Sequence, residues 1–268
     1  MPRFICRACG TQYPESQTPP AHCPICEDER QFVNWEGQSW TTLEDLRRAH
    51  RARMQQEGPG LTGIGSEPSF AIGERALLVE TPHGNVLWDC IALIDDEIIE
   101  AVKARGGLKA IAISHPHYYT TMVEWSDAFG GIPIYIHADD MKWVRHPHPA
   151  IVPWTGETHA LSPDLTLIRC GGHFDGGAVL HWAGGDEGRG ALLSGDIVQV
   201  VQDRRHVSFM FSYPNLIPLN AGAIERIRAA LAPYAFDSIY GAWWGRNIIG
   251  GGREAFDVSV ERYLRAIA

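Results

Sequence analysis

Short apolar blocks alternate with amphipathic stretches from residue 68 to the end of the chain. Apolar blocks bounded by turn-forming residues are typical of strands, whereas apolar residues three and four positions apart are typical of helices. Residues 76–80 and 85–88 predict a hairpin that turns at 82–84. The alternation of strands and helices beyond this hairpin predicts an α/β fold.

The remaining elements of this region follow the same pattern. Helices are predicted at 95–105, 223–231 and 254–267, and strands at 108–113, 132–136, 165–169, 178–182, 191–193 and 238–240. His115, His173 and Asp196 each follow one of the predicted strands. The sequence therefore predicts that chemically active side chains gather at strand ends.

The first 33 residues contain two C-x-x-C pairs, Cys6 with Cys9 and Cys23 with Cys26. Pairs of this spacing let four thiolates converge on one tetrahedral ion. The segment between the pairs is rich in Pro and predicts a loop. These residues resemble a zinc ribbon or a rubredoxin-like pair of knuckles, which implies a structural zinc site. Iron is the alternative, because the spacing suits both metals.

A connector is expected between this module and the main region. Thr41, Thr42, Leu43 and Glu44 resemble a capping box, which predicts a helix from there to about Gln56. The Gly-Pro-Gly sequence at 58–60 is expected to end it, and a loop is expected as far as residue 68. The chain is thus predicted to contain a four-cysteine module at 1–33, a connector at 34–67 and a main domain at 68–268.

Five short motifs of the main domain occur in the order found in the metallo-β-lactamase superfamily. They are Gly-Asn-Val-Leu-Trp-Asp at 84–89, His-Pro-His at 115–117, Gly-His at 172–173, Ser-Gly-Asp at 194–196 and Tyr-Gly-Ala-Trp-Trp-Gly at 240–245. The main domain resembles that superfamily on these motifs. The resemblance implies an αββα sandwich, here with a small four-cysteine zinc ribbon in front.

The resemblance also implies a metal centre. In the superfamily the residues that match His115, His117 and His173 bind one ion, and the residue that matches Asp196 bridges to a second. Three imidazoles and a carboxylate suit zinc or a similar ion. We therefore expect these four side chains to bind a metal in the main domain, with iron as the alternative to zinc.

The positions of a second ion are changed. Tyr119 stands where the superfamily has Asp, Thr120 where it has His, and Trp243 where it has its last His. A phenol, a hydroxyl and an indole are poor ligands for a divalent ion at neutral pH. The sequence therefore predicts a mononuclear centre.

Other residues near these motifs receive supporting roles. Asp89 and His137 are expected to support the metal ligands from behind. Tyr119 either donates a proton to the reaction or fills the space of the missing ion, and Asp196 either binds the metal or accepts a proton. Trp243, Trp244 and Tyr118 are expected to line a substrate pocket. Cys90 and Cys170 are expected to pack in the core.

Three functions fit this pattern. The first is a metal-dependent hydrolase whose ion activates water against an ester, thioester, lactone or amide of a small apolar or aromatic substrate. The second is a mononuclear iron oxygenase of the persulfide-dioxygenase type, with His115, His173 and Asp196 as ligands. The third is a non-catalytic binding module that the metals only stabilise.

Composition limits the partners and the cellular location that we expect for the protein. A formal net charge of -9 and the lack of a basic run argue against nucleic-acid binding. The N-terminus has no apolar signal core, and no apolar run is long enough to cross a membrane. We expect a cytoplasmic enzyme that acts on a small molecule, and a homo-oligomer remains open.

Overall fold

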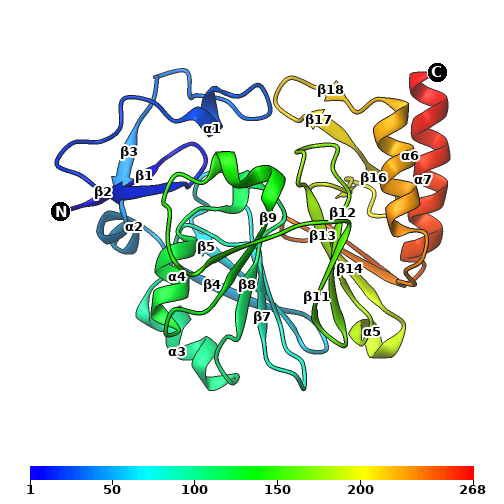
Figure 1. Ribbon diagram of the computed structural model, residues 1–268, viewed down its shortest axis with the longest axis horizontal. Helices are drawn as coiled ribbons and strands as arrows, with labels where there is room; N and C mark the ends of the chain where they lie inside the picture. The colour runs from blue at the N-terminus through cyan, green and yellow to red at the C-terminus, as the bar shows by residue number, and fades with distance from the viewer. The chain divides into compact units, whose positions relative to one another are not determined.

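The computed structural model describes residues 1–268 and divides the chain into two compact units. The first unit comprises Met1–Ile136 and Met141–Pro153, and the second comprises His137–Asp140 and Trp154–Ala268. Both contain a central sheet with helices (Figure 1).

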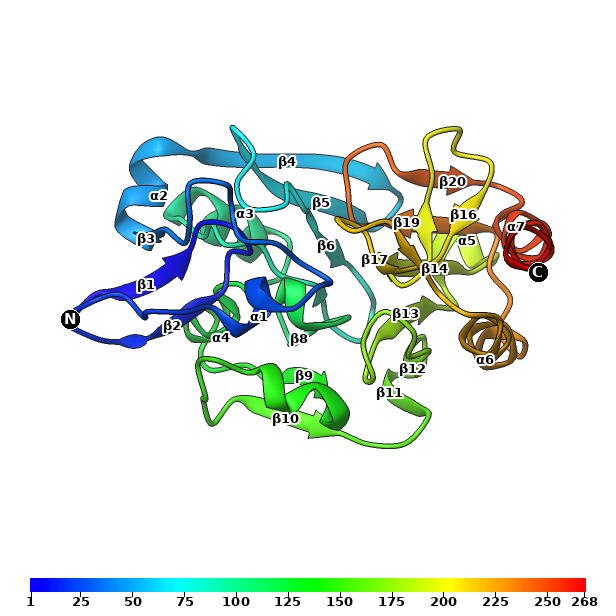
Figure 2. The ribbon, with the colours of Figure 1, turned by 90° about the horizontal axis from the view of Figure 1, so that it is seen from above.

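The cysteine module is built on a small antiparallel sheet in the first unit. Its strand order is β2-β1-β3, with β1 at Arg3–Cys6, β2 at Gln12–Glu15 and β3 at Trp40–Thr42. Cys6 is the last residue of β1, and Cys9 lies in the turn that leads to β2. Strands β1 and β2 lie side by side (Figure 2). In the second pair, Cys23 is the N-cap of α1 (Pro24–Glu27), and Cys26 lies within this helix.

The larger sheet of the first unit has seven strands in the order β10-β9-β8-β7-β6-β5-β4. Strands β4 to β7 are antiparallel, and β7, β8 and β9 are parallel. Their bounds are Arg51–Gly58 (β4), Leu61–Glu67 (β5), Ala76–Val79 (β6), Val86–Trp88 (β7), Ala110–Ala112 (β8), Ile134–His137 (β9) and Ile151–Trp154 (β10). The predicted hairpin is confirmed as β6 and β7.

The connector differs from its prediction. Helix α2 begins after Thr42, whose hydroxyl accepts from Asp45 N at 3.2 Å, but it spans only Leu43–Ala49. The next residues form β4, which pairs along its length with β5. The predicted helix to Gln56 and the predicted loop to residue 68 are therefore wrong. Pairing with β5, which buries Leu61 and Ile64, outweighs the helix propensity of Arg, Met and Gln in β4.

The helices of the first unit follow its strands. Helix α3 (Asp96–Ala104) is confirmed, and Asp95 caps it by accepting from Ile98 N at 2.8 Å. Two 3-10 helices, η1 (Pro116–Tyr118) and η2 (Ala138–Trp143), and one α-helix, α4 (Met122–Ala128), were not predicted. Helix α4 packs on β8, the strand that precedes the His-Pro-His motif.

The second unit contains a six-stranded sheet in the order β11-β12-β13-β14-β19-β20. Only β14 and β19 are parallel neighbours. The strands span Thr158–Ser162 (β11), Leu165–Arg169 (β12), Ala178–Trp182 (β13), Ala191–Gly195 (β14), Ser238–Gly241 (β19) and Asn247–Ile249 (β20). The short helix α5 (Gly185–Gly188) precedes β14.

Two long helices cover this sheet. Helices α6 (Ala221–Leu231) and α7 (Gly252–Ile267) lie side by side and close an apolar core over β12, β13, β14 and β19 (Figure 1). Two small pairs complete the unit: β15 (Gln199–Val200) with β16 (Val207–Ser208), and β17 (Met210–Ser212) with β18 (Ile217–Pro218). No helix is both long and apolar enough to cross a membrane.

Candidate metal centres

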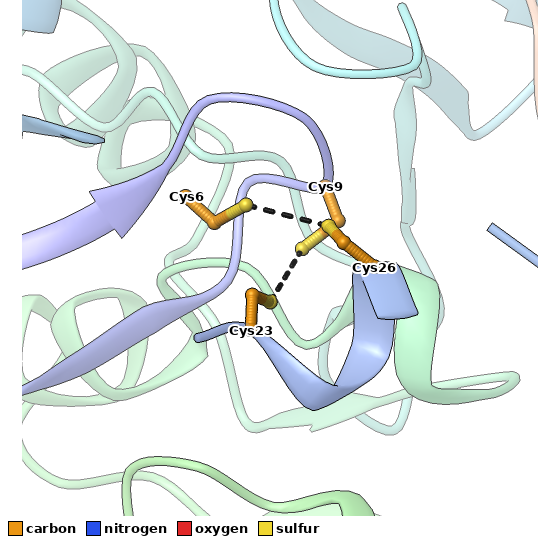
Figure 3. A group of neighbouring side chains, drawn as sticks. All are labelled: Cys6, Cys9, Cys23 and Cys26. Atoms are coloured by element: carbon orange, nitrogen blue, oxygen red, sulfur yellow. Dashed lines mark hydrogen bonds between the residues drawn. The ribbon is translucent and has the colours of Figure 1, made fainter. Parts of the chain in front are cut away.

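The four cysteines of the first unit form a compact buried cluster (Figure 3). Cys6 Sγ lies 3.4 Å from Cys26 Sγ, and Cys9 Sγ lies 3.7 Å from Cys23 Sγ. All four sulfur atoms lie within 4.8 Å of one another, and none forms a disulfide. Each C-x-x-C pair thus supplies one sulfur to each of the two close contacts.

This arrangement fits a tetrahedral ion. Four sulfur atoms each about 2.3 Å from a zinc ion are separated by about 3.8 Å, close to the spacing found here. Gln38 Nε2 donates to Cys6 Sγ at 3.1 Å, which favours a thiolate. Hydrogen bonds among the four thiols lower the pKa of Cys6 and, led by the bond with Cys26, the pKa of Cys23 to about 7. The bonds with Cys23 raise the pKa of Cys9 and of Cys26, so the cluster shares its protons unevenly. The predicted four-cysteine cluster is therefore present, with donors suited to a metal.

The second candidate group consists of His115, His117, His173 and Asp196, and all four are buried. The first two belong to the first unit and the last two to the second. Three imidazoles and one carboxylate are a donor set typical of zinc sites. Each unit thus carries two of the four candidate donors.

His115 and His117 follow β8, as the sequence predicted. Their rings pack edge to face, with centroids 5.0 Å apart. His115 Nδ1 lies 3.0 Å from Ser114 Oγ, and Ser114 Oγ in turn hydrogen-bonds Asp89. Because a carboxylate only accepts, the Ser114 hydroxyl donates to Asp89 and accepts from His115 Nδ1–H. This makes Nε2 the nitrogen of His115 that could bind a metal.

Asp89 is fixed behind this histidine. Its Oδ1 accepts from Ser114 N at 2.7 Å, and its backbone adopts a φ of 61°, which Asp tolerates better than most residues. Burial raises the pKa of Asp89 to about 7, although the hydrogen bonds from Ser114 act in the opposite direction. The contacts agree with the predicted supporting role, which passes through Ser114.

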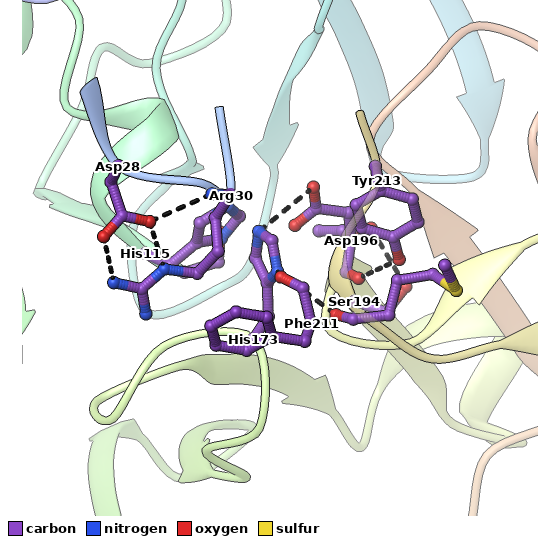
Figure 4. A network of polar contacts seen from close by, with 11 residues as sticks. Asp28, Arg30, His115, His173, Ser194, Asp196, Phe211 and Tyr213 are labelled. Carbon is purple, nitrogen blue, oxygen red and sulfur yellow. Dashed lines mark hydrogen bonds and ion pairs between the residues drawn. The ribbon is translucent and has the colours of Figure 1, made fainter. Parts of the chain in front are cut away.

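The segment after the second cysteine pair lies near His117. Asp28 Oδ1 and Oδ2 accept from Arg30 Nε at 2.6 Å and Nη2 at 2.8 Å (Figure 4). Burial alone would raise the pKa of Asp28, but the Arg30 guanidinium outweighs it, and His117 adds to the lowering. Sequence analysis did not find this neighbourhood, because residues 28–30 match no motif.

His173 and Asp196 form the half of the group in the second unit. His173 lies in the β12–β13 loop, and its Nδ1–H donates to the carbonyl of Phe211 at 2.8 Å and to that of Met210 at 3.2 Å. Its Nε2 therefore carries the lone pair, 3.9 Å from Asp196 Oδ2 (Figure 4). Asp196 follows β14 directly, as predicted.

Sequence analysis missed Tyr213. Its hydroxyl donates to the Asp196 carbonyl at 2.7 Å, and its ring lies 5.5 Å from that of His173. Burial, followed by the charge of Asp196, raises the pKa of Tyr213 well above its ordinary value. The contact joins the β17–β18 turn to the end of β14 over a distance in sequence at which no local pattern gives a signal.

The remaining predicted residues have different surroundings. Tyr118 and Tyr119 are buried, and the Tyr118 ring lies 4.8 Å from that of His115. Trp243 and Trp244 are half-buried in the turn after β19. Their assignment to a substrate pocket stays a prediction.

His137 and the two isolated cysteines also have defined places. His137 Nε2–H donates to the Gly156 carbonyl at 3.1 Å, and Nδ1 accepts from Asp139 N at 3.2 Å. Both nitrogens are thus engaged with backbone groups, which favours a structural role. Cys90 and Cys170 are fully buried, in agreement with the expected core packing.

One curated relative covers the whole chain. It is described as the uncharacterized protein YmaE of Bacillus subtilis, strain 168, and is 48% identical over 269 residues, covering 100% of this chain and 97% of the relative. The chain belongs to the YmaE family. No family model matches it.

Comparison with solved structures shows the fold of the chain. The chain matches VMB-1 with a TM-score of 0.61 and 14% identity, covering 81% of this chain and 99% of that one. It matches the metallo-β-lactamase FIM-1 of Pseudomonas aeruginosa with a TM-score of 0.54 and 16% identity, over 80% and 96% of the two chains. The metallo-β-lactamase fold predicted from five short motifs is therefore confirmed.

Proposed function

We propose that this chain is a hydrolase with one catalytic metal ion, zinc by preference, bound by His115, His117, His173 and Asp196. The observation that carries the proposal is the donor set itself. Three buried imidazoles and one buried carboxylate follow strands of a metallo-β-lactamase fold.

The proposed centre is mononuclear. Tyr119, Thr120 and Trp243 stand at positions that hold ligands of the second ion in the superfamily, and none offers a comparable donor. The metallo-β-lactamase FIM-1 has been crystallised in a mono-zinc form, which supports a single-ion centre on this fold.

Hydrogen bonds set the orientation of the proposed ligands. The Phe211 and Met210 carbonyls fix His173 with Nε2 as its donor atom. The chain from His115 through Ser114 to Asp89 does the same for His115. Such bonds raise the basicity of an imidazole and prevent its ring from rotating away. A zinc ion held there would supply an activated water and would polarise a carbonyl of the substrate.

The chain's own groups complete the proposed chemistry. Asp196 is the carboxylate available to accept a proton from the attacking water, and Tyr213 holds its backbone in place. Tyr119, which follows the histidines by two residues, is the proposed proton donor to the leaving group. Trp243, Trp244 and Tyr118 would surround an apolar or aromatic ester, thioester, lactone or amide with aromatic surface.

Elemental analysis of alanine variants tests the proposal. We expect about two metal ions per wild-type chain, one at the cysteines and one at the main centre. His115→Ala and His173→Ala should each remove one ion and abolish hydrolysis of a panel of esters, thioesters and lactones. His83→Ala, in the exposed turn between β6 and β7, is the matched control and should keep both.

Several results would contradict this function. Unchanged turnover in a His115→Ala protein without main-centre metal would exclude metal-assisted hydrolysis. Three ions per wild-type chain would show that the second-ion positions still bind metal. Iron in place of zinc, together with oxygen consumption, would instead support the dioxygenase alternative.

A further inference from the structure

The first cysteine pair lies against the loop that carries His115 and His117. We infer that the four-cysteine module is a positioning element, whose bound metal holds the 115–120 segment in the shape that binds the main-centre ion. This inference rests on the proposed function in one respect, because it takes His115 and His117 as ligands. All the contacts that carry it lie within the first unit.

Two direct contacts join the module to this segment. Gln12 N donates to the Thr120 carbonyl at 2.9 Å. Gly10, which follows Cys9, sits so close to the same residue that a Cβ on it would lie 3.1 Å from Thr120 Cγ2 and 3.4 Å from Ala92 Cβ. A side chain at position 10 would therefore crowd Thr120 and Ala92, whereas glycine fits there.

Thr120 is the residue that most needs such support. Its φ of 30° is unusual for a β-branched side chain and persists only where neighbouring groups hold it. On its far side, Met122 N donates to the Tyr119 carbonyl at 2.9 Å, and Thr121 Oγ1 donates to the carbonyls of Ile91 and Ala92 at 3.1 Å. The Gln12 N–H holds the Thr120 carbonyl from the side of the cysteine module.

Contacts within residues 6–11 connect the Gln12–Thr120 hydrogen bond to the cysteine thiols. Gly10 N donates to the Cys6 carbonyl at 2.9 Å, and Cys6 N donates to the Thr11 carbonyl at 3.0 Å. Cys9 Sγ also contacts Thr11 Oγ1 at 3.4 Å. These bonds close residues 6–11 into one turn around the sulfur atoms. Loss of the ion would leave four crowded buried thiols and loosen the turn that holds Thr120.

A second link joins the module to α4, the helix after the histidine loop. Gln12 Nε2 donates to Glu124 Oε1 at 3.0 Å, and Arg3 Nη1 lies 3.1 Å from the same oxygen. The backbone and the side chain of Gln12 thus hold both ends of the segment from Thr120 to Glu124. Groups that support metal ligands indirectly typically contribute about 10- to 100-fold to metal affinity.

A pair of glycine variants tests this role with all eight proposed ligands intact. Gly10 lies in the module and Gly37 in the segment between α1 and β3, and both have a positive φ, 75° and 93°, so alanine strains the backbone at each. Only at Gly10 does the added methyl meet Thr120, because nothing lies within 4 Å of the position at Gly37. Gly37→Ala is therefore the matched control for Gly10→Ala.

Two readouts are compared between these variants. Chelator competition measures the affinity of the main centre, and hydrogen exchange measures the protection of amides 114–121. We expect Gly10→Ala to weaken main-centre affinity at least tenfold and to speed exchange in 114–121, whereas Gly37→Ala should match the wild type. Cobalt substitution, read from the sulfur-to-metal absorption, checks that the cysteine site stays loaded.

A variant that cannot bind metal at the cysteines tests the positioning role independently. The Cys9→Ser/Cys26→Ser double variant should show the same faster exchange in 114–121, and if it does not fold, the glycine pair still decides. Equal affinity and equal exchange in Gly10→Ala and Gly37→Ala would overturn the inference. If the wild type binds no main-centre metal, the proposed function fails, whereas the exchange comparison still tests the positioning role.

Discussion

At the scale of single residues, a buried carboxyl group has a strongly raised pKa. Glu74 is almost fully buried, and its Oε2 has no hydrogen-bond partner. Burial raises the pKa of Glu74 to about 8, although hydrogen bonds from its own backbone and that of Ile72 act to lower it. Glu74 therefore keeps a proton in the folded state over a pH range in which the unfolded chain releases it.

This difference gives stability a definite pH dependence. From about pH 4 to pH 8 the folded chain binds the extra Glu74 proton, so the free energy of unfolding falls as pH rises, by about 1.4 kcal/mol per pH unit for this group. Glu74→Gln should remove that part of the fall between pH 5 and pH 8. Urea unfolding across this range measures it, with exposed Glu100→Gln as control. A Glu74→Gln protein with the full wild-type slope would contradict the assignment.

At the scale of elements, loops after strands carry the chemistry, and their backbone shape decides where each side chain lies. Residues 171–177 connect β12 and β13 and contain four glycines around His173. Gly172 has a φ of 85°, and a Cβ there would lie 2.8 Å from Leu219 Cδ1. The histidine therefore depends on a close approach of its own loop to a buried leucine.

A substitution at Gly172 tests this dependence. Gly172→Ala should lower the free energy of unfolding by about 1–3 kcal/mol more than Gly188→Ala, because overpacking is added to backbone strain. Gly188 has a φ of 87° with nothing within 4 Å, and thus controls for the strain. Urea unfolding gives the two values, and metal retention shows whether His173 is displaced. Equal losses in the two variants would mean that the loop moves away from Leu219 without cost.

The connector shows the limit of element prediction. Its capping signal at Thr41–Glu44 lay one residue early, because the N-cap is Thr42. The helix stops at Ala49, and the polar residues after it form β4. The periodicity of residues 51–58 is weak, so the pairing partner β5 determined their conformation. Strands at the ends of a sheet are hard to predict from sequence, because the contacts that stabilise them come from another segment.

On the scale of the whole molecule, the cysteine module and the second unit differ in what stabilises them. The apolar cluster of the module contains Cys6, Ala8, Cys9, Cys23, Ile25 and Cys26, so most of its members are the proposed ligands themselves. The second unit has a large aliphatic and aromatic core under α6 and α7. A module whose buried core consists mostly of proposed metal ligands is expected to depend on the ion for folding.

Metal removal should therefore destabilise the cysteine module more than the second unit. With a strong chelator we expect the amides of β1 and β2 to lose most of their hydrogen-exchange protection, while those of α6 and α7 keep theirs. Returning zinc should restore the first set. Equal loss in both regions would show that the second unit also needs the metal to fold.

The sequence by itself determined the fold class, the four cysteines and the four main-centre ligand candidates. The cysteine cluster follows from local spacing, because the geometry of a C-x-x-C pair is a property of four neighbouring positions. The sandwich fold and the main-centre candidates came from the resemblance of five short motifs to the metallo-β-lactamase superfamily. The tertiary structure alone decided that β4 is a strand, that Tyr213 supports Asp196, and that Gly10 and Gln12 hold Thr120. Each of those depends on segments far apart in the chain, whose contacts no local pattern records.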